Sequence, residues 1–104
     1  MKKYGLHGSL KATSGKRDEL AQILLYAAKM VSTANGCLLY FVSIDNTDAD
    51  SIWITEAWDS KEDHDNSLKA ENVRTLISRA MPLLDGIPVK GLELDILGGK
   101  GINH

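Results

Sequence analysis

The sequence has few of the features that mark special classes of protein. It contains one cysteine and two prolines among 104 residues, and no apolar run is long enough to cross a bilayer. One cysteine cannot form an intrachain disulfide, and Cys37 lies in an apolar run with no nearby cysteine or histidine, as expected for a buried thiol. Met1-Lys2-Lys3 is not followed by the apolar core of a signal peptide, so we expect a cytoplasmic protein with no membrane partner.

An excess of charge of one sign is also missing. The 12 Lys and Arg residues face 14 Asp and Glu residues, the formal net charge is -2, and the two signs are interleaved along the chain. Without a basic stripe to neutralise phosphates, nucleic acid is excluded as the main partner. The fractions of hydrophobic (43%) and charged (25%) residues are those of an ordinary globular protein, and the length predicts one domain spanning residues 1–104.

The spacing of apolar residues predicts the first half of the fold. These residues alternate over residues 4–12, which is typical of a half-buried strand. From residue 20 to residue 31 they recur at helical spacing, and Asn35-Gly36 provides a stop signal for this helix. Residues 37–44 and 51–58 are rich in strand formers, and the polar connection between them indicates a hairpin.

Capping residues predict the second half. Ser60 and Asp63 have capping-box spacing at the start of one helix, and Asn72 can cap a further helix whose apolar face runs to residue 84. Asp85-Gly86 would end that helix, and residues 92–96 alternate as a last strand.

The resulting order is βαββαβ. This order predicts a ferredoxin-like α+β fold, with a four-stranded antiparallel sheet covered by helices on one face. However, residues 37–44 and 51–58 carry large apolar side chains on both parities, so both faces of the sheet need cover. We therefore predict a homodimer in which two sheets pack face to face.

The histidines do not indicate a metal site. His7, His64 and His104 are scattered, and none has a histidine or cysteine four residues away. Ser67 lies one helical turn from His64, but Asp65 is expected to point elsewhere on that helix, so the spacing does not predict a Ser-His-Asp triad.

The strongest candidates for chemistry lie where strand 51–58 leads into the next helix. Glu56 and Trp58 share a face of the strand, which places a carboxylate beside a large aromatic ring. Glu56 either pairs with a structural partner or takes part in chemistry. His64 is either a solvated residue of an acidic helix or a proton acceptor near a pocket, and Trp58 can be both core and pocket wall.

Three segments, GKRDELAQILLYAA, GCLLYFVSIDNTD and IWITEAWDSKEDHDNSL, occur in this order. Together they resemble the antibiotic biosynthesis monooxygenase family, which includes quinol monooxygenases. The most specific parts are Gly-Cys-Leu-x-Tyr at residues 36–40 and Glu-x-Trp at residues 56–58. The resemblance implies a dimeric ferredoxin-like α+β barrel with a pocket in each subunit. Some members oxygenate activated aromatic substrates with O₂ and neither metal nor flavin, while relatives degrade haem or isomerise small metabolites.

The chain departs from the family pattern at one position. Many relatives carry a histidine nine residues after the tryptophan of Glu-x-Trp, where this chain has Ser67, and His64 lies one turn earlier. Haem-degrading relatives bind iron through a histidine in this region, so the departure argues against haem. We expect a cofactor-independent monooxygenase that oxidises a small electron-rich aromatic, such as a quinol, with O₂.

In this hypothesis each candidate residue has a role. His64 is the base or proton shuttle, Glu56 orients one of the reacting groups, and Ser67 or Asn66 donates a hydrogen bond to a developing oxyanion. Trp58 and Tyr40 flank the ring of the substrate. Two alternatives stay open: a non-catalytic dimeric module that binds a hydrophobic metabolite, and a small-molecule isomerase with the same pocket.

Overall fold

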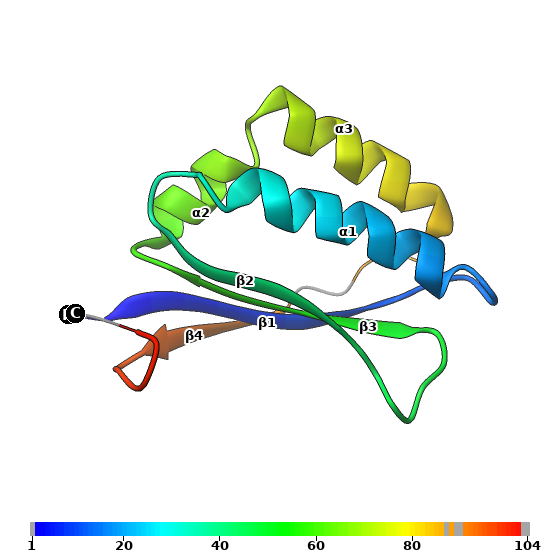
Figure 1. Ribbon diagram of the computed structural model, residues 1–104, viewed down its shortest axis with the longest axis horizontal. Helices are drawn as coiled ribbons and strands as arrows, with labels where there is room; N and C mark the ends of the chain where they lie inside the picture. The colour runs from blue at the N-terminus through cyan, green and yellow to red at the C-terminus, as the bar shows by residue number, and fades with distance from the viewer. Residues whose placement is uncertain (1, 87, 89–90, 103–104) are drawn as a thin grey trace.

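Four antiparallel strands form one sheet, and all helices lie on one side of it (Figure 1). The computed structural model describes residues 2–86, 88 and 91–102. The strands are β1 (Lys3–Lys11), β2 (Cys37–Ile44), β3 (Ser51–Trp58) and β4 (Leu92–Ile96), in the spatial order β2-β3-β1-β4. This order confirms the predicted ferredoxin-like α+β fold.

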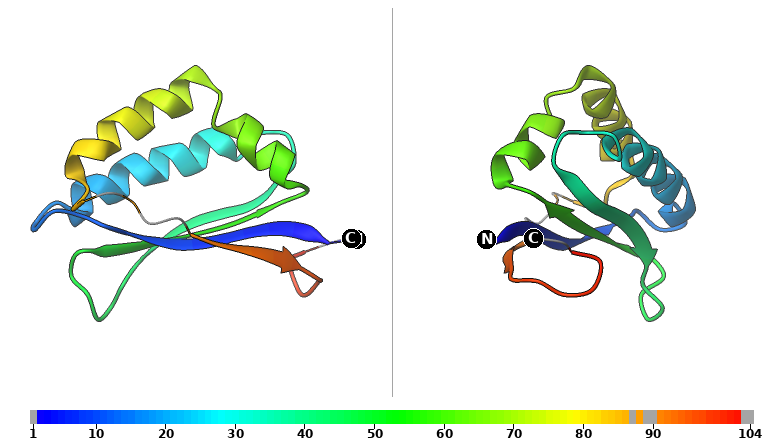
Figure 2. Two further views of the ribbon diagram at one scale, coloured as in Figure 1. Left: turned by 180° about the vertical axis from the view of Figure 1, so that it is seen from behind. Right: turned by 60° about the vertical axis from the view of Figure 1, so that its left-hand side comes forward.

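The helices form a second layer. They are α1 (Arg17–Val31), α2 (Lys61–Ser67), α3 (Glu71–Ala80) and a short 3₁₀ helix, η1 (Met81–Leu83). Figures 1 and 2 show α1 and α3 side by side over the sheet, while α2 lies at the end of the sheet where β3 finishes. No helix among the described residues is long and apolar enough to span a membrane.

Two helix boundaries differ from those expected. Asn72 is not the cap of α3, because this helix begins at Glu71 and the Asn72 side chain accepts a hydrogen bond from the adjacent Val73 amide instead (2.9 Å). The α-helix ends at Ala80 rather than at residue 84, since Pro82 has no amide hydrogen to continue it and the chain tightens into η1. The Ser60 cap is confirmed: its hydroxyl accepts a hydrogen bond from the Asp63 amide (3.1 Å).

Strand register sorts the side chains of β3 between two environments. Ile52, Ile54, Glu56 and Trp58 face the helices, and Ile52 and Trp58 are completely buried. Together with Leu20 of α1, which is also completely buried, they anchor the helix layer to the sheet. This burial of apolar surface is the main source of stability for the two-layer arrangement.

The opposite, open face of the sheet is apolar and uncovered. By register it carries Leu39 and Phe41 of β2 and Leu92 and Leu94 of β4, whose side chains are between 37% and 63% exposed. Strict alternation would place Cys37 on this face with Leu39 and Phe41, but a bulge between Cys37 and Leu39 turns the thiol toward the helix side, opposite Trp58.

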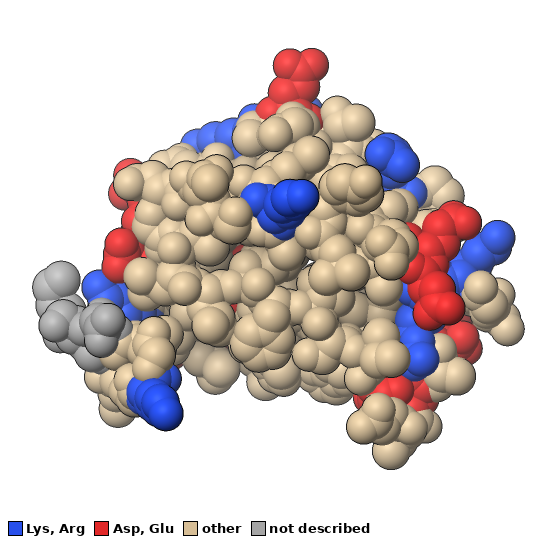
Figure 3. Space-filling view, in the orientation of Figure 1, with Lys and Arg blue, Asp and Glu red and all other residues tan. Residues whose placement is uncertain are grey.

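Charged side chains do not form a patch of one sign on the face seen in Figure 3. Lys and Arg mix with Asp and Glu at the two ends of this face, and few charges lie in the middle, over α1 and β2. This face therefore offers no basic stripe for a phosphate backbone.

Candidate functional site

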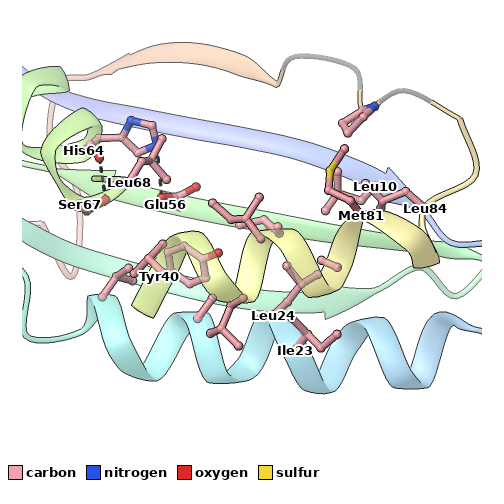
Figure 4. Close-up of a pocket in the computed structure, with 18 residues that line it drawn as sticks. Leu10, Ile23, Leu24, Tyr40, Glu56, His64, Ser67, Leu68, Met81 and Leu84 are labelled. Atoms are coloured by element: carbon pink, nitrogen blue, oxygen red, sulfur yellow. Dashed lines mark hydrogen bonds and ion pairs between the residues drawn. The ribbon is translucent and has the colours of Figure 1, made fainter. Parts of the chain in front are cut away.

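A cavity of about 230 Å³ lies between the sheet and helices α1 and α3. Its wall is mostly apolar, and among the described residues the polar side chains that line it are Tyr40, Glu56, His64 and Ser67. Figure 4 shows Glu56, His64 and Ser67 together at the end of the cavity near α2. The structure thus brings the three residues expected to be catalytic into one cavity, and Tyr40 of β2 forms part of its wall.

His64 lies between two carboxylates. Its Nδ1 atom is 2.9 Å from Oδ1 of Asp65, and its Nε2 atom is 3.8 Å from Oε1 of Glu56. The side chain is only 12% exposed, and its ring lies nearly perpendicular to that of Trp58 and close to that of Tyr4, with centroid separations of 5.7 Å and 5.5 Å. These contacts fix the ring at the polar end of the cavity.

The contact with Asp65 corrects the sequence-based expectation. Asp65 does not point elsewhere on α2; its side chain reaches back to the ring of the preceding histidine, and Lys61 Nζ holds its other oxygen at 3.0 Å. The hydrogen bonds from His64 and then from Lys61 lower the pKa of Asp65, so this carboxylate is ionised and can only accept. Nδ1 is therefore the donor of this hydrogen bond, and Nε2 is the ring nitrogen directed toward Glu56.

The pKa of Glu56 is shifted in the opposite direction to that of Asp65. Burial raises its pKa, while the indole Nε1–H of Trp58, which donates to Oε1 at 3.0 Å, and the nearby His64 limit the rise. Among the described residues, no lysine or arginine forms an ion pair with Glu56. One histidine is therefore flanked by a carboxylate with a lowered pKa and one with a raised pKa, an arrangement typical of proton-transfer sites.

Local sequence explains why α2 lies where it does. Asn35 Nδ2 donates to Asp63 Oδ1 (3.2 Å), which ties the turn between α1 and β2 to α2. Gly36 makes this possible, because its φ is 82° and a side chain there would collide with Asp63. Lys3 of β1 pairs with Asp59 at the start of the turn into α2 (2.9 Å).

Ser67 and Tyr40 present oxygen atoms to the cavity under different constraints. The Ser67 hydroxyl donates to the His64 carbonyl (2.6 Å), one helical turn back. Toward the cavity, the Ser67 oxygen can therefore only accept a hydrogen bond. There is accordingly no hydrogen bond from Ser67 to the His64 ring. Burial, followed by the charge of Glu56, raises the pKa of Tyr40, which keeps its hydroxyl protonated and able to donate.

Trp58 and Asn66, expected to contact substrate, do not line this cavity. Trp58 is completely buried behind it, where it donates to Glu56 and supports His64. Asn66 lines a separate, more polar hollow between α1, α2 and α3, and its side-chain oxygen accepts from Lys69 (3.2 Å).

Sequence reasoning missed Asp65 and Tyr4. Burial, then the hydrogen bond that Tyr4 donates to Glu93 (3.0 Å), raises the pKa of Tyr4 to about 12. Its place on the same strand face as Leu10 was evident from the alternation, but its approach to His64 depends on how α2 turns.

No group of three potential metal ligands occurs among the described residues, and His104 lies outside them.

The chain is a ferredoxin-like α+β domain with a largely apolar cavity between its sheet and its helices. The model of the family described as "Antibiotic biosynthesis monooxygenase" matches residues 4–79, and the chain belongs to this family. This membership supports a monooxygenase-like function.

Solved structures that are similar to this chain carry the same family description. The crystal structure of a "putative Antibiotic biosynthesis monooxygenase" from Chloroflexus aurantiacus is 42% identical, covers 97% of this chain and 99% of its own, and has a TM-score of 0.86. One of the same description from Deinococcus radiodurans is 27% identical (97% of each chain, TM-score 0.73). Another, from Caulobacter crescentus, is 21% identical (93% and 92%, TM-score 0.85) and shares the fold. No curated protein matches the chain.

Proposed function

We propose that the protein is a monooxygenase that oxidises a small electron-rich aromatic, of the quinol type, with O₂ and without a cofactor. The observation that carries this proposal is the position of His64, whose Nδ1 is held by Asp65 and whose Nε2 lies at the polar end of an otherwise apolar cavity. A ring bound in the cavity would place a phenolic hydroxyl near Nε2.

The first step is proton removal. A phenol has a pKa of about 10, and its anion is far more easily oxidised than the neutral form. His64 takes the proton at Nε2, and the resulting imidazolium is stabilised by Asp65 on one side and by ionised Glu56 on the other. The Tyr40 hydroxyl donates toward the phenolate oxygen, and the apolar wall keeps water out.

The second step is reduction of O₂ by the bound anion. The substrate transfers an electron to O₂, and the two radicals combine to form a peroxide at a ring carbon that carries hydrogen. The O–O bond then breaks: one oxygen atom stays on the ring carbon, whose hydrogen leaves as a proton to the departing oxygen, and this oxygen takes a second proton from His64 and leaves as water. A hydroquinone would thereby become a hydroxyquinone, and the substrate alone supplies the electrons that O₂ accepts.

The experiment is O₂ consumption across a panel of quinols. In His64→Gln, which keeps the size of this buried side chain, we expect turnover to fall at least about 100-fold, as for loss of a general base. His7→Gln is the matched control, because His7 lies on the open face, where Nδ1 contacts Thr55 (3.0 Å) and the ring stacks on Trp53.

The outcomes separate the candidate functions. Full turnover in His64→Gln would remove His64 from the reaction. If the wild-type protein binds quinols but consumes no O₂, the binding module or the isomerase is the better description.

We infer in addition that the protein is a homodimer. The apolar open face, with Leu39, Phe41, Leu92 and Leu94 exposed, is the surface that a second sheet would cover. A monomer mass by light scattering at micromolar concentration would contradict this inference.

A further inference from the structure

The end of the cavity away from His64 has no role in the proposed reaction. Its wall is built from α1, β1, α3 and the turn that follows, and Figure 4 shows Leu10, Met81 and Leu84 there, opposite the end with Glu56, His64 and Ser67. We call this region the distal end; its wall consists of Leu10, Ile23, Leu24, Ala80, Met81 and Leu84.

The cavity has more room than one aromatic ring needs. A cavity of roughly 150 Å³ lined by aliphatic side chains is sufficient to bind benzene, whereas this one measures about 230 Å³. The excess has a direction: the lining residues of α3 run from Val73, beside the polar end, to Ala80 at the distal end, a rise of about 10 Å along the helix. A ring held at His64 therefore leaves the distal end unfilled.

The distal end also opens to water along an apolar edge. Ile77 and Met81 line the cavity on the side of α3, and they are 43% and 49% exposed. Among the described residues, the polar side chains of the cavity wall are Tyr40, Glu56, His64 and Ser67. Figure 4 shows the last three at the opposite end of the cavity, near α2. Inside the distal end, away from this opening, a hydroxyl, amide or charged group would lose its water and meet only apolar side chains of the described wall.

We infer that the distal end is a subsite for an aliphatic substituent on the aromatic substrate, so that the preferred substrate class is an alkyl-substituted quinol. The placement of the ring rests on the proposed function. The chain of such a substrate extends from the ring along α3 toward Met81, and longer chains leave the cavity past Ile77 and Met81.

The test measures binding rather than oxidation. Calorimetric titration without oxygen would use hydroquinones that carry a methyl, propyl or pentyl group, together with a hydroxypropyl analogue. Because each buried methylene contributes about 0.8 kcal/mol, we expect affinity to rise roughly fourfold per added carbon until the chain reaches solvent. The hydroxypropyl analogue should bind more weakly than the propyl compound.

Met81→Gln probes the subsite in the protein. Met81 is about half exposed, so a polar residue of similar length is tolerated there, and the gain in affinity with chain length should shrink while the methyl compound binds as before. Leu25→Gln is the matched control, since Leu25 is equally exposed (48%) but lies outside the cavity wall. It should leave the whole series unchanged.

Several outcomes would overturn the subsite: no dependence on chain length, tighter binding of the hydroxypropyl analogue, or equal effects of the two variants. These results do not depend on turnover. If the series behaves as expected but O₂ consumption is absent, the subsite stands and the monooxygenase proposal fails.

Discussion

On the helix-covered face of the sheet, β3 presents Glu56 and Trp58, whereas on the open face the same strand presents Trp53 and Thr55. Both faces contain a histidine with a hydrogen-bonded Nδ1. His64 meets a carboxylate beside a cavity, while His7 meets the Thr55 hydroxyl under the ring of Trp53.

The difference lies in what closes each face. The helices of the chain itself cover the first face, leave a cavity there, and shield Glu56 from water. The second face keeps large apolar side chains exposed and holds no carboxylate of β3. A group that must exchange protons belongs on the first face, and a surface that must bind another chain is expected on the second.

The largest expected difference between the faces is in folding stability. Ile52 is completely buried under the helices, so Ile52→Ala should lower the free energy of unfolding by about 2–5 kcal/mol. Leu92 on the open face is 63% exposed, and Leu92→Ala should cost about 0.5 kcal/mol or less at protein concentrations low enough to keep chains apart. Urea unfolding checks both; equal losses would contradict the assignment of the core to one face.

Association should respond to the open face alone. Phe41→Lys places a charge where a second sheet is expected, and should weaken the dimer by about 2 kcal/mol or more, roughly 30-fold in dissociation constant. Tyr26→Lys is the control, because Tyr26 is also exposed (60%) but lies on α1. Sedimentation velocity distinguishes them, and a dimer that tolerates Phe41→Lys would place the contact elsewhere.

Within the covered face, Asp65 should affect turnover less than His64. Asp65→Asn keeps a side chain of similar size but no longer fixes the hydrogen on Nδ1, so we expect kcat to fall about 10-fold with little change in KM. Steady-state O₂ uptake measures both constants. Unchanged kcat would mean that the ring is held without Asp65.

The smallest effect concerns pH and Glu56. Burial raises the pKa of Glu56 in the folded protein above its pKa in the unfolded chain. The free energy of unfolding therefore falls as pH rises through the interval between these two pKa values. Glu56→Gln imitates the protonated form and can still accept from Trp58. It should be more stable than wild type at about pH 8, with a smaller gain at about pH 5.

Thermal unfolding at the two pH values checks this prediction. Glu62→Gln on α2 removes a charge from an exposed position and serves as its control. A loss of stability in Glu56→Gln at the higher pH would show that the ionised carboxylate is a net stabilising partner of His64.

Much of the fold could be predicted from the sequence because it depends on local periodicity. Alternation places Tyr4 and Leu10 on one face of β1, and the Ser60 cap starts α2 as expected. The end of α3 could not be placed from apolar spacing, since the pattern continues past Pro82 while the backbone cannot donate there.

The candidate site was predictable only in part. That Glu56 and His64 approach the same cavity follows from the strand face and the capped helix, but their roles stay predictions. The Asp65 contact depends on side-chain rotamers, which spacing along a helix does not encode. The indole of Trp58 turns toward Glu56 rather than the cavity for the same reason, because buried donors seek acceptors wherever packing allows.

The bulge in β2 determines which changes of chain length the sheet can accept. Cys37 already lies opposite Trp58 and Leu39 opposite Ala57, so Leu38 is an additional residue in the ladder. Its deletion would restore regular pairing and leave every other side chain of β2 on its present face. In β3, by contrast, the loss of one residue would exchange Glu56 with a neighbour from the open face, so length variation among relatives is expected in β2 and not in β3.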